Sequence, residues 1–346
     1  DDLNRALAKY GFIFPPDPAS SSVSTIGGNV ATNAGGIKGA KYGTTRDYVL
    51  GLQVVLSTGE VMRTGSYTMK CVSGYELSKL FVGSEGTLGV ITEVTLKINP
   101  IPKHAMTAVA TFNKLEDAGK AISQTMTSGI VPSVLEILDK VTLKSIKENT
   151  DIDLPEAEAM ILTETDGYTW EEVEAQMEMI LNILKQNNPI SIKTAKDEKD
   201  RLNLWKARKS AYGTLARTSN SFVLDDVTVP VSRIPELLVG IQEISQRHGM
   251  TVATFGHAGD GNLHPQILYD EYDPEQVKKV EEVEEEIFRL AISLNGTLSG
   301  EHGIGLSKAN YMTLEHDPVE MALMRQIKRT LDPNNIMNPG KRALDD

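Results

Sequence analysis

Cysteine is almost absent from this chain of 346 residues, which contains only Cys71. A single cysteine excludes a disulfide framework and a cluster of cysteine ligands for iron and sulfur. The sequence therefore predicts a protein of a reducing compartment, the cytoplasm. The residues around Cys71, namely Met69, Val72 and Tyr75, favour an inert thiol in the core over a catalytic one.

Long apolar runs and excess positive charge are missing as well. No stretch reaches the roughly 18 apolar residues that a membrane span needs, and the formal net charge is -12. A charge of this sign argues against nucleic acid or an anionic membrane surface as partner. The chain starts without Met, inside a helical pattern at Asp1-Asp2-Leu3. We therefore expect a fragment of a longer globular protein.

The first hundred residues are rich in glycine and in short strand patterns. Residues 50–56 and 60–63 flank Thr58-Gly59 and are typical of a hairpin with a tight turn. Residues 90–98 alternate like a half-buried strand, and Asn99-Pro100-Ile101-Pro102 ends it. These prolines indicate a domain boundary near residue 102.

After residue 105, strand patterns alternate with amphipathic helices. A helix from Thr169 is predicted by the Thr169 and Glu172 capping pair, and its apolar stripe includes Trp170, Val173 and Met177. Gly249 is the expected C-terminal cap of a helix over 234–248. Two further helices are predicted over 274–294 and from Asp317-Pro318 onward.

Two glycine-rich segments lie in the first part of the chain. Residues 25–36 are expected to form a loop with two glycine pairs, and residues 83–89 a second one. Glycine lets backbone amides approach a pyrophosphate closely. Taken alone, the first segment is better explained as a tight turn in a β-rich domain, and the second is as ambiguous. Their presence together favours a bound nucleotide.

Histidine clusters in two other glycine-flanked segments. His257 and His264 are separated by a stretch with two glycines, and Glu301-His302 lies between further glycines. This spacing permits a metal centre of two imidazoles and one carboxylate with open positions, formed by His257, His264 and Glu301. His302 would then be an acid or base. On this pattern alone a non-haem iron oxygenase, a zinc hydrolase and a dehydrogenase are equally acceptable.

Arg208, which ends the motif Trp205-Lys206-Ala207-Arg208, is a further candidate site residue. The guanidinium fork matches a substrate carboxylate in geometry and charge. Most arginines on such a helix are solvated, and only the neighbouring motifs distinguish this one.

The order of these motifs resembles that of one flavoprotein family. Residues 25–36, 41–47, 83–92, 205–208, 256–264, 299–305 and 338–341 are similar to the FAD-linked D-lactate dehydrogenase and glycolate oxidase catalytic subunits. That resemblance implies the vanillyl-alcohol oxidase (VAO/PCMH-type) fold, of class α+β. Residues 1–102 would be the second subdomain of the FAD-binding domain, and residues 103–310 an antiparallel-sheet cap, the FAD-linked oxidase C-terminal domain. Residues 311–346 would be a helical segment that returns to the flavin.

The resemblance also assigns roles to single residues. His257, His264 and Glu301 would bind a divalent metal (Zn, Fe or Mn), Arg208 would bind the substrate carboxylate, and His302 would take the hydroxyl proton. FAD contacts are expected from Pro16, Thr25, Ile26, Gly28, Asn29, Thr32, Gly36, Tyr42, Gly43, Glu85, Gly86, Ile91 and Asn338. The family's upstream pyrophosphate-binding subdomain has no counterpart here, so we expect the chain by itself to bind FAD weakly.

The implied reaction is oxidation of a small D-2-hydroxy acid, D-lactate or glycolate, to the 2-oxo acid. D-2-hydroxyglutarate or a longer 2-hydroxy acid, a redox-neutral flavoenzyme, and a non-catalytic scaffold that docks an electron-transfer partner are the alternatives. Electrons would pass to a quinone, to oxygen, or to a partner such as an electron-transfer flavoprotein or an iron–sulfur subunit. A homodimer is compatible with the sequence.

Overall fold

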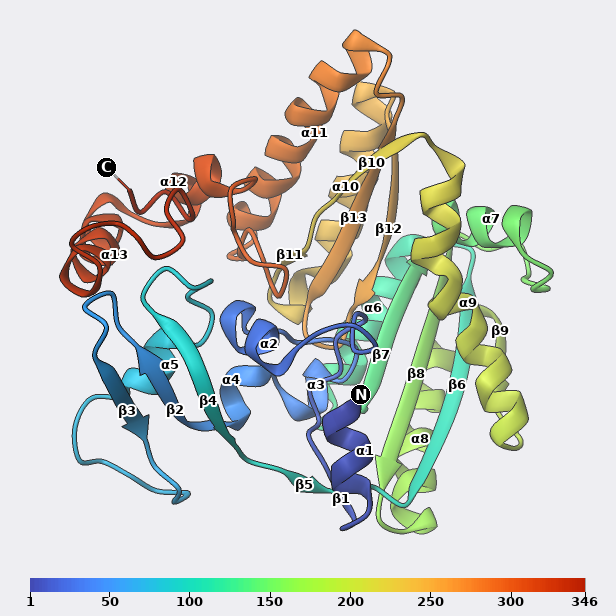
Figure 1. The fold of residues 1–346 in the computed structure, drawn as a ribbon. Helices are drawn as coiled ribbons and strands as arrows, with labels where there is room; N and C mark the ends of the chain where they lie inside the picture. The colour runs from blue at the N-terminus through green and yellow to red at the C-terminus, as the bar shows by residue number, and fades with distance from the viewer. Residues whose placement is uncertain (346) are drawn as a thin grey trace. The chain divides into compact units, whose positions relative to one another are not determined.

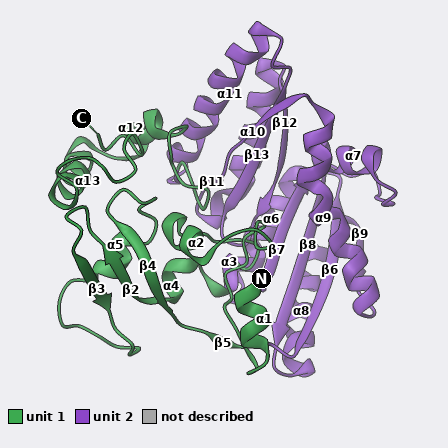
Figure 2. Ribbon diagram, in the orientation of Figure 1, with its two compact units in different colours: residues 1–38, 42–101, 298–346 green, residues 39–41, 102–297 purple. Residues whose placement is uncertain are grey.

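The chain divides into two compact units in a computed structural model that describes residues 1–345 (Figure 2). Unit 1 comprises residues 1–38, 42–101 and those from 298 onward, and unit 2 comprises residues 39–41 and 102–297. The first division falls at the proline pair near residue 102. Residues 298–310, which the sequence assigned to the second domain, pack with unit 1 instead.

Unit 1 is built on a three-stranded antiparallel sheet. The predicted hairpin is confirmed: β2 (Val49–Val55) pairs with β3 (Val61–Gly65), and Gly59 in the turn has a φ of 85°. The predicted strand β4 (Val90–Leu96) pairs with the other edge of β2, giving the order β3-β2-β4. A separate short pair joins β1 (Phe12–Ile13) to β5 (Asn99–Pro100).

Helices cover this sheet and close the core of unit 1. Val30, Leu52 and Phe81 are buried in it, and Ile327 and Leu331 of the last helix pack against the same cluster. Residues 25–36 are not the plain loop that the sequence predicted, because Thr25 caps a helix through its hydroxyl, which accepts from Gly28 N. The helices are α1 (Asp2–Ala8), α2 (Ile26–Thr32), α3 (Gly39–Tyr42, mostly unit 2), α4 (Thr45–Tyr48), α5 (Leu77–Phe81), η2 (Ala309–Tyr311), α12 (Met312–Glu315) and α13 (Pro318–Leu331).

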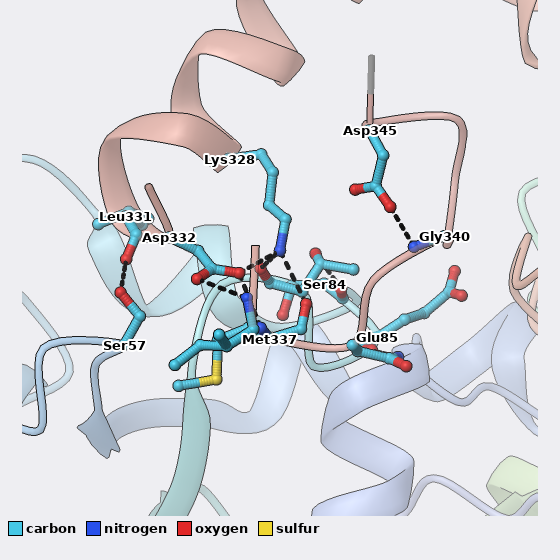
Figure 3. Close-up of polar contacts among 12 residues, drawn as sticks. Ser57, Ser84, Glu85, Lys328, Leu331, Asp332, Met337, Gly340 and Asp345 are labelled. Atoms are coloured by element: carbon cyan, nitrogen blue, oxygen red, sulfur yellow. Dashed lines mark hydrogen bonds and ion pairs between the residues drawn. The ribbon is translucent and has the colours of Figure 1, made fainter. Parts of the chain in front are cut away.

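A buried ion pair fixes the end of α13 (Figure 3). Lys328 and Asp332 are 3% and 2% exposed. The Lys328 ammonium donates to Asp332 and to the carbonyl oxygens of Thr87 (3.0 Å) and Met337 (2.7 Å). Asp332 in turn accepts from the backbone N–H of Met337 (2.8 Å). One lysine thus connects α13, the chain after it and the glycine-rich segment 83–89.

Unit 2 is built on an eight-stranded antiparallel sheet (Figure 1). The strand order is β10-β13-β12-β7-β8-β6-β9, with β11 also paired to β13. The strands are β6 (His104–Phe112), β7 (Val134–Asp139), β8 (Ala159–Gly167), β9 (Pro189–Thr194), β10 (Ser221–Leu224), β11 (Val227–Thr228), β12 (Thr251–His257) and β13 (Asn262–Tyr269).

Helices pack on both faces of the sheet of unit 2. One group comprises α6 (Leu115–Thr127), α8 (Trp170–Gln186), α10 (Ile234–His248), preceded by η1 (Val231–Arg233), and α11 (Pro274–Ser293). The other comprises α7 (Lys140–Asn149) and α9 (Glu198–Thr218). Ala207, Ala211 and Leu215 of α9 share a buried cluster with Ala253 and Phe255 of β12. The face beneath α9 is therefore part of the core.

The helix boundaries predicted in unit 2 are largely confirmed. Gly249 caps α10 with a φ of 62°, and the Thr169 hydroxyl accepts from Glu172 N at the start of α8. The Glu172 carboxylate accepts from Tyr168 N, one residue before the expected partner. Trp170 is not buried as predicted. It is 50% exposed and lies 4.8 Å from the His104 ring, because its position precedes the buried stripe of α8.

The prediction of a core position for Cys71 is wrong. Cys71 is exposed, as are Met69 and Val72, and Tyr75 is 95% exposed. All four lie in the connection between β3 and α5. Apolar residues in a segment without a helix or strand period have no face to bury, which is why the local composition misled.

Asp139 is a carboxyl group whose protonation changes near neutral pH. It caps α7 by accepting from Thr142 N, and it also accepts from Thr254 N, both at 2.8 Å. Burial raises the pKa of Asp139 to about 6, although these donors lower it. The folded pKa exceeds the unfolded value of about 3.9, so the folded state binds this proton more tightly. This group therefore adds stability as the pH falls from 7 through 6.

Wild type is expected to gain free energy of unfolding relative to Asp139→Asn between pH 7.5 and pH 5. The asparagine cannot titrate, so its variant lacks this contribution at every pH. Urea unfolding of both proteins at pH 7.5, 6 and 5 measures the difference. Parallel pH dependences would contradict the raised pKa of Asp139.

Candidate functional site

His257 and His264 lie on the same face of the unit 2 sheet. Phe255 is directly opposite His264 in the β12–β13 pair, and His257 follows Phe255 by two residues. Both histidines therefore point to the side of Phe255. Their ring centroids are 5.0 Å apart at 86°, and each residue is 4% exposed. The prediction that the two imidazoles face the same side of the chain agrees with their positions in unit 2.

The turn between these histidines requires glycine at one position. Gly261 has a φ of 87°, and a Cβ there would lie 2.0 Å from the carbonyl oxygen of Val229. Any other residue would push the start of β13 away from the segment that follows β11. This close approach fixes the register that brings His264 beside His257.

Arg208 reaches the same face from α9. It is 8% exposed, and its guanidinium carbon lies 5.0 Å from the centre of the Phe255 ring. Arg208 Nε donates to Glu136 Oε2, and His257 Nδ1 lies 2.6 Å from Glu136 Oε1. Glu136, in the middle of β7, is 0% exposed. Sequence reasoning missed it, although a glutamate inside the apolar run Val134–Leu138 was a signal.

The charge state of Glu136 follows from its neighbours. Burial by itself would raise its pKa, but the positive Arg208 and the His257 ring favour the carboxylate. The pKa of Glu136 therefore lies below its ordinary value. An ionised glutamate accepts both hydrogen bonds and balances the arginine charge.

Two further polar side chains on β13 were not predicted. Asn262 and Gln266 flank His264 at a spacing of two, so all three share one face. Gln266 is 0% exposed, and within residues 1–345 neither its Nε2 nor its Oε1 has a hydrogen-bond partner. Buried amide atoms without partners are costly. They fit a polar ligand or water next to the histidines, and their alternation with His264 was the available signal.

Glu301 and His302 belong to unit 1, in the segment 299–305. Ser299 and Gly303 close a tight loop, since Ser299 Oγ accepts from Gly303 N at 2.9 Å. The Glu301 carboxylate lies near Gly35: a Cβ on that glycine would be 3.0 Å from Glu301 Oε2. The glycine-rich segment 25–36 and the loop that carries Glu301 are thus neighbours within unit 1.

Glu85 anchors the same loop. Its Oε1 accepts from Ile304 N at 2.9 Å and its Oε2 from Gly305 N at 2.7 Å. Its backbone has a φ of 54°, and its carbonyl accepts from the Asn338 amide. Glu85 and Asn338 were predicted as FAD contacts, and here both also hold the polypeptide in place.

Several expected FAD contacts line one cavity of unit 1. Its volume is about 420 Å³, and Pro16, Thr25, Ile26 and Asn29 are among its walls. The remaining expected FAD contacts also belong to unit 1 but do not line this cavity: Gly28, Thr32, Gly36, Tyr42, Gly43, Glu85, Gly86, Ile91 and Asn338. The Ser84 hydroxyl is buried and has no hydrogen-bond partner within the described chain. A hollow with small and polar walls fits a nucleotide cofactor, whereas Ser84 belongs to the second glycine-rich segment, outside those walls.

Two models of known protein families match this chain. Residues 101–342 match the model described as FAD linked oxidases, C-terminal domain, and residues 1–65 match the model described as FAD binding domain. The chain belongs to the FAD-linked oxidases. Among curated relatives, this FAD-linked oxidase is 43% identical to the glycolate oxidase subunit GlcD of Bacillus subtilis, over 100% of the chain and 73% of that protein.

Other relatives carry two kinds of name. GlcD of Escherichia coli (strain K12) is 37% identical over 98% of the chain and 68% of that protein. A mitochondrial D-lactate dehydrogenase [cytochrome] of Arabidopsis thaliana is 37% identical over 98% of the chain and 60% of that protein. The FAD-linked oxidase thus spans about 60 to 73% of the length of these three relatives.

Solved structures confirm the predicted fold class. A 4-ethylphenol oxidase from Gulosibacter chungangensis superimposes with a TM-score of 0.74 at 19% identity, over 98% of the chain and 74% of that chain. A p-cresol methylhydroxylase gives 0.74 at 16%, over 99% and 74%. The FAD-linked oxidase therefore has the VAO/PCMH-type fold. Within residues 1–345, none of the helices has both the length and the apolar character that crossing a bilayer requires.

Proposed function

We propose that this FAD-linked oxidase converts a small D-2-hydroxy acid, D-lactate or glycolate, to the 2-oxo acid, and that it needs a divalent metal (Zn, Fe or Mn). The observation that supports this most is the buried pair His257 and His264 beside Arg208 on one sheet face. Two imidazoles and a cation suit a metal-bound anionic substrate. The names of the relatives, glycolate oxidase and D-lactate dehydrogenase, agree with it.

Three residues would bind the metal. His257 and His264 would be two ligands, and Glu301 of unit 1 would be the third, as the family motif suggests. The donor set of two imidazoles and one carboxylate fits Zn, Fe or Mn. When bound at these residues, a divalent metal would supply polarisation of the substrate hydroxyl, and FAD would supply an acceptor for the hydride.

His302 would remove the proton from the substrate hydroxyl. Imidazole is the side chain that most often serves as a general base. The neighbouring Glu301 and the anchoring of segment 299–305 by Glu85 would hold it in place. Electrons would then leave to a quinone or to a partner, such as an electron-transfer flavoprotein or an iron–sulfur subunit, in the cytoplasm.

Arg208 would bind the carboxylate of the substrate. Its Nε is engaged by Glu136, so the edge formed by the two Nη atoms remains for two parallel hydrogen bonds. Arg208→Lys is expected to raise KM more than it lowers kcat, because an ammonium group cannot reproduce the fork. Steady-state kinetics with D-lactate and glycolate measure both constants. An unchanged KM would remove Arg208 from the substrate site.

The decisive experiment follows the flavin spectrum under anaerobic conditions. The complete, flavin-loaded and metal-replete protein is mixed with D-lactate, L-lactate, glycolate or D-2-hydroxyglutarate. Bleaching by D-lactate or glycolate that a chelator abolishes would support the reaction and its metal. Bleaching by D-2-hydroxyglutarate alone would change the substrate, and no bleaching by any of them would contradict the proposal.

A further inference from the structure

One buried carboxylate contacts two of the proposed functional side chains. Glu136 Oε1 lies 2.6 Å from His257 Nδ1, and Glu136 Oε2 accepts from Arg208 Nε. Glu136 is 0% exposed and lies on β7, which pairs with β12. The strand that carries His257 and the helix that carries Arg208 are therefore both fixed to the same side chain.

The contact with Glu136 determines which nitrogen His257 can offer to a metal. An ionised carboxylate only accepts, so Nδ1 must carry the hydrogen. Nε2 is then the nitrogen that carries the lone pair, and a hydrogen-bonded carboxylate makes that nitrogen a better metal ligand. Without Glu136, the ring would be free to adopt the other tautomer or to rotate.

The second contact determines which edge Arg208 presents. Because Nε donates to Glu136, the guanidinium plane is fixed, and its far edge carries the two Nη groups. The Phe255 ring limits movement on one side of that plane. An arginine released from Glu136 would keep its charge but lose its orientation.

We propose that Glu136 is a positioning residue that orients the metal-ligating Nε2 of His257 and the substrate-binding edge of Arg208 together. This inference rests on the proposed function. It assigns one side chain to both metal affinity and substrate affinity, so the two should change together when it is altered.

A second buried glutamate offers a matched control. Glu164 of β8 is 4% exposed and accepts from Arg201 Nε (2.9 Å) and Trp205 Nε1 (3.1 Å) of α9. It thus holds α9 to the sheet as Glu136 does, but through Arg201 and Trp205 rather than through Arg208. Any effect of merely loosening α9 should appear in Glu164→Gln as well.

The test compares Glu136→Gln and Glu164→Gln in the complete, flavin-loaded protein. Affinity for Zn²⁺ is measured by competition with a chromogenic chelator, and KM and kcat are measured with the acid that bleaches the flavin. For Glu136→Gln we expect Zn²⁺ affinity to fall about 10- to 100-fold and KM to rise more than kcat falls. Glu164→Gln should retain both affinities.

Equal losses in the two variants, or wild-type values in Glu136→Gln, would overturn this inference alone. If Glu136→Gln does not fold, Glu136→Asp keeps the charge but is one methylene too short to reach both partners. Wild-type Zn²⁺ affinity and KM in that variant would also overturn it. A wild-type protein that binds no Zn²⁺ and shows no bleaching would overturn the proposed function first, and this inference with it.

Discussion

Replacing His264 by alanine is expected to remove bound metal and turnover together, whereas His302→Ala should lose turnover and keep the metal. His264 would be a ligand, and its buried ring lies on the sheet face that also carries His257. His302 would act on the proton alone, and loss of a general base lowers rates by about 10² to 10⁴. Elemental analysis measures the bound metal, and anaerobic flavin reduction measures turnover.

His248→Ala provides the control for this pair. His248 lies at the end of α10 and its Nε2 is 3.0 Å from Glu286 Oε1. It takes no part in the proposed site, so metal content and turnover should stay at wild-type levels. Equal metal loss in the His264 and His302 variants would contradict the division of roles between ligand and base.

Replacing Lys328 by methionine is expected to lower the free energy of unfolding by about 3–5 kcal/mol, the usual cost of breaking a buried ion pair on one side. Methionine nearly matches the lysine in volume but leaves Asp332 buried without its cation. The carbonyl oxygens of Thr87 and Met337 lose a donor as well. Chemical unfolding at neutral pH measures the change.

Lys278→Met is the matched control for Lys328→Met. Lys278 has a side chain that is 80% exposed, and its nitrogen is 3.9 Å from Glu282. An exposed pair of this kind contributes little, so the change should stay within about 0.5 kcal/mol. A similar small effect in Lys328→Met would mean that the buried pair does not stabilise unit 1.

Local patterns in the sequence predicted local structure well. The hairpin of β2 and β3 followed from Thr58-Gly59 between two strand-like runs, and the end of α10 followed from Gly249. Both depend on backbone preferences of a few adjacent residues. Cys71 shows the limit, because apolar neighbours without a period do not specify burial.

The candidate site was predictable only in part. His257 and His264 were found because they are only seven positions apart and glycines mark the turn between them. Glu136 was missed because its partner His257 is 121 residues away, and the pairing exists only once β7 and β12 are neighbours. Gln266 was missed because the burial of its amide without a hydrogen-bond partner depends on the packing of the folded chain. The sequence shows only that Gln266 alternates with His264.

The division of unit 1 along the chain has a consequence for synthesis on the ribosome. Unit 2 is nearly continuous, whereas unit 1 is left at Ile101 and resumed at Leu298. The hydrogen bonds from Ile304 N and Gly305 N to Glu85 therefore cannot form until that second part has been synthesised. At about 5–20 residues per second, that delay is roughly 10 to 40 s. During this interval the nascent chain holds a sheet, β3-β2-β4, whose last covering helix, α13, does not yet exist.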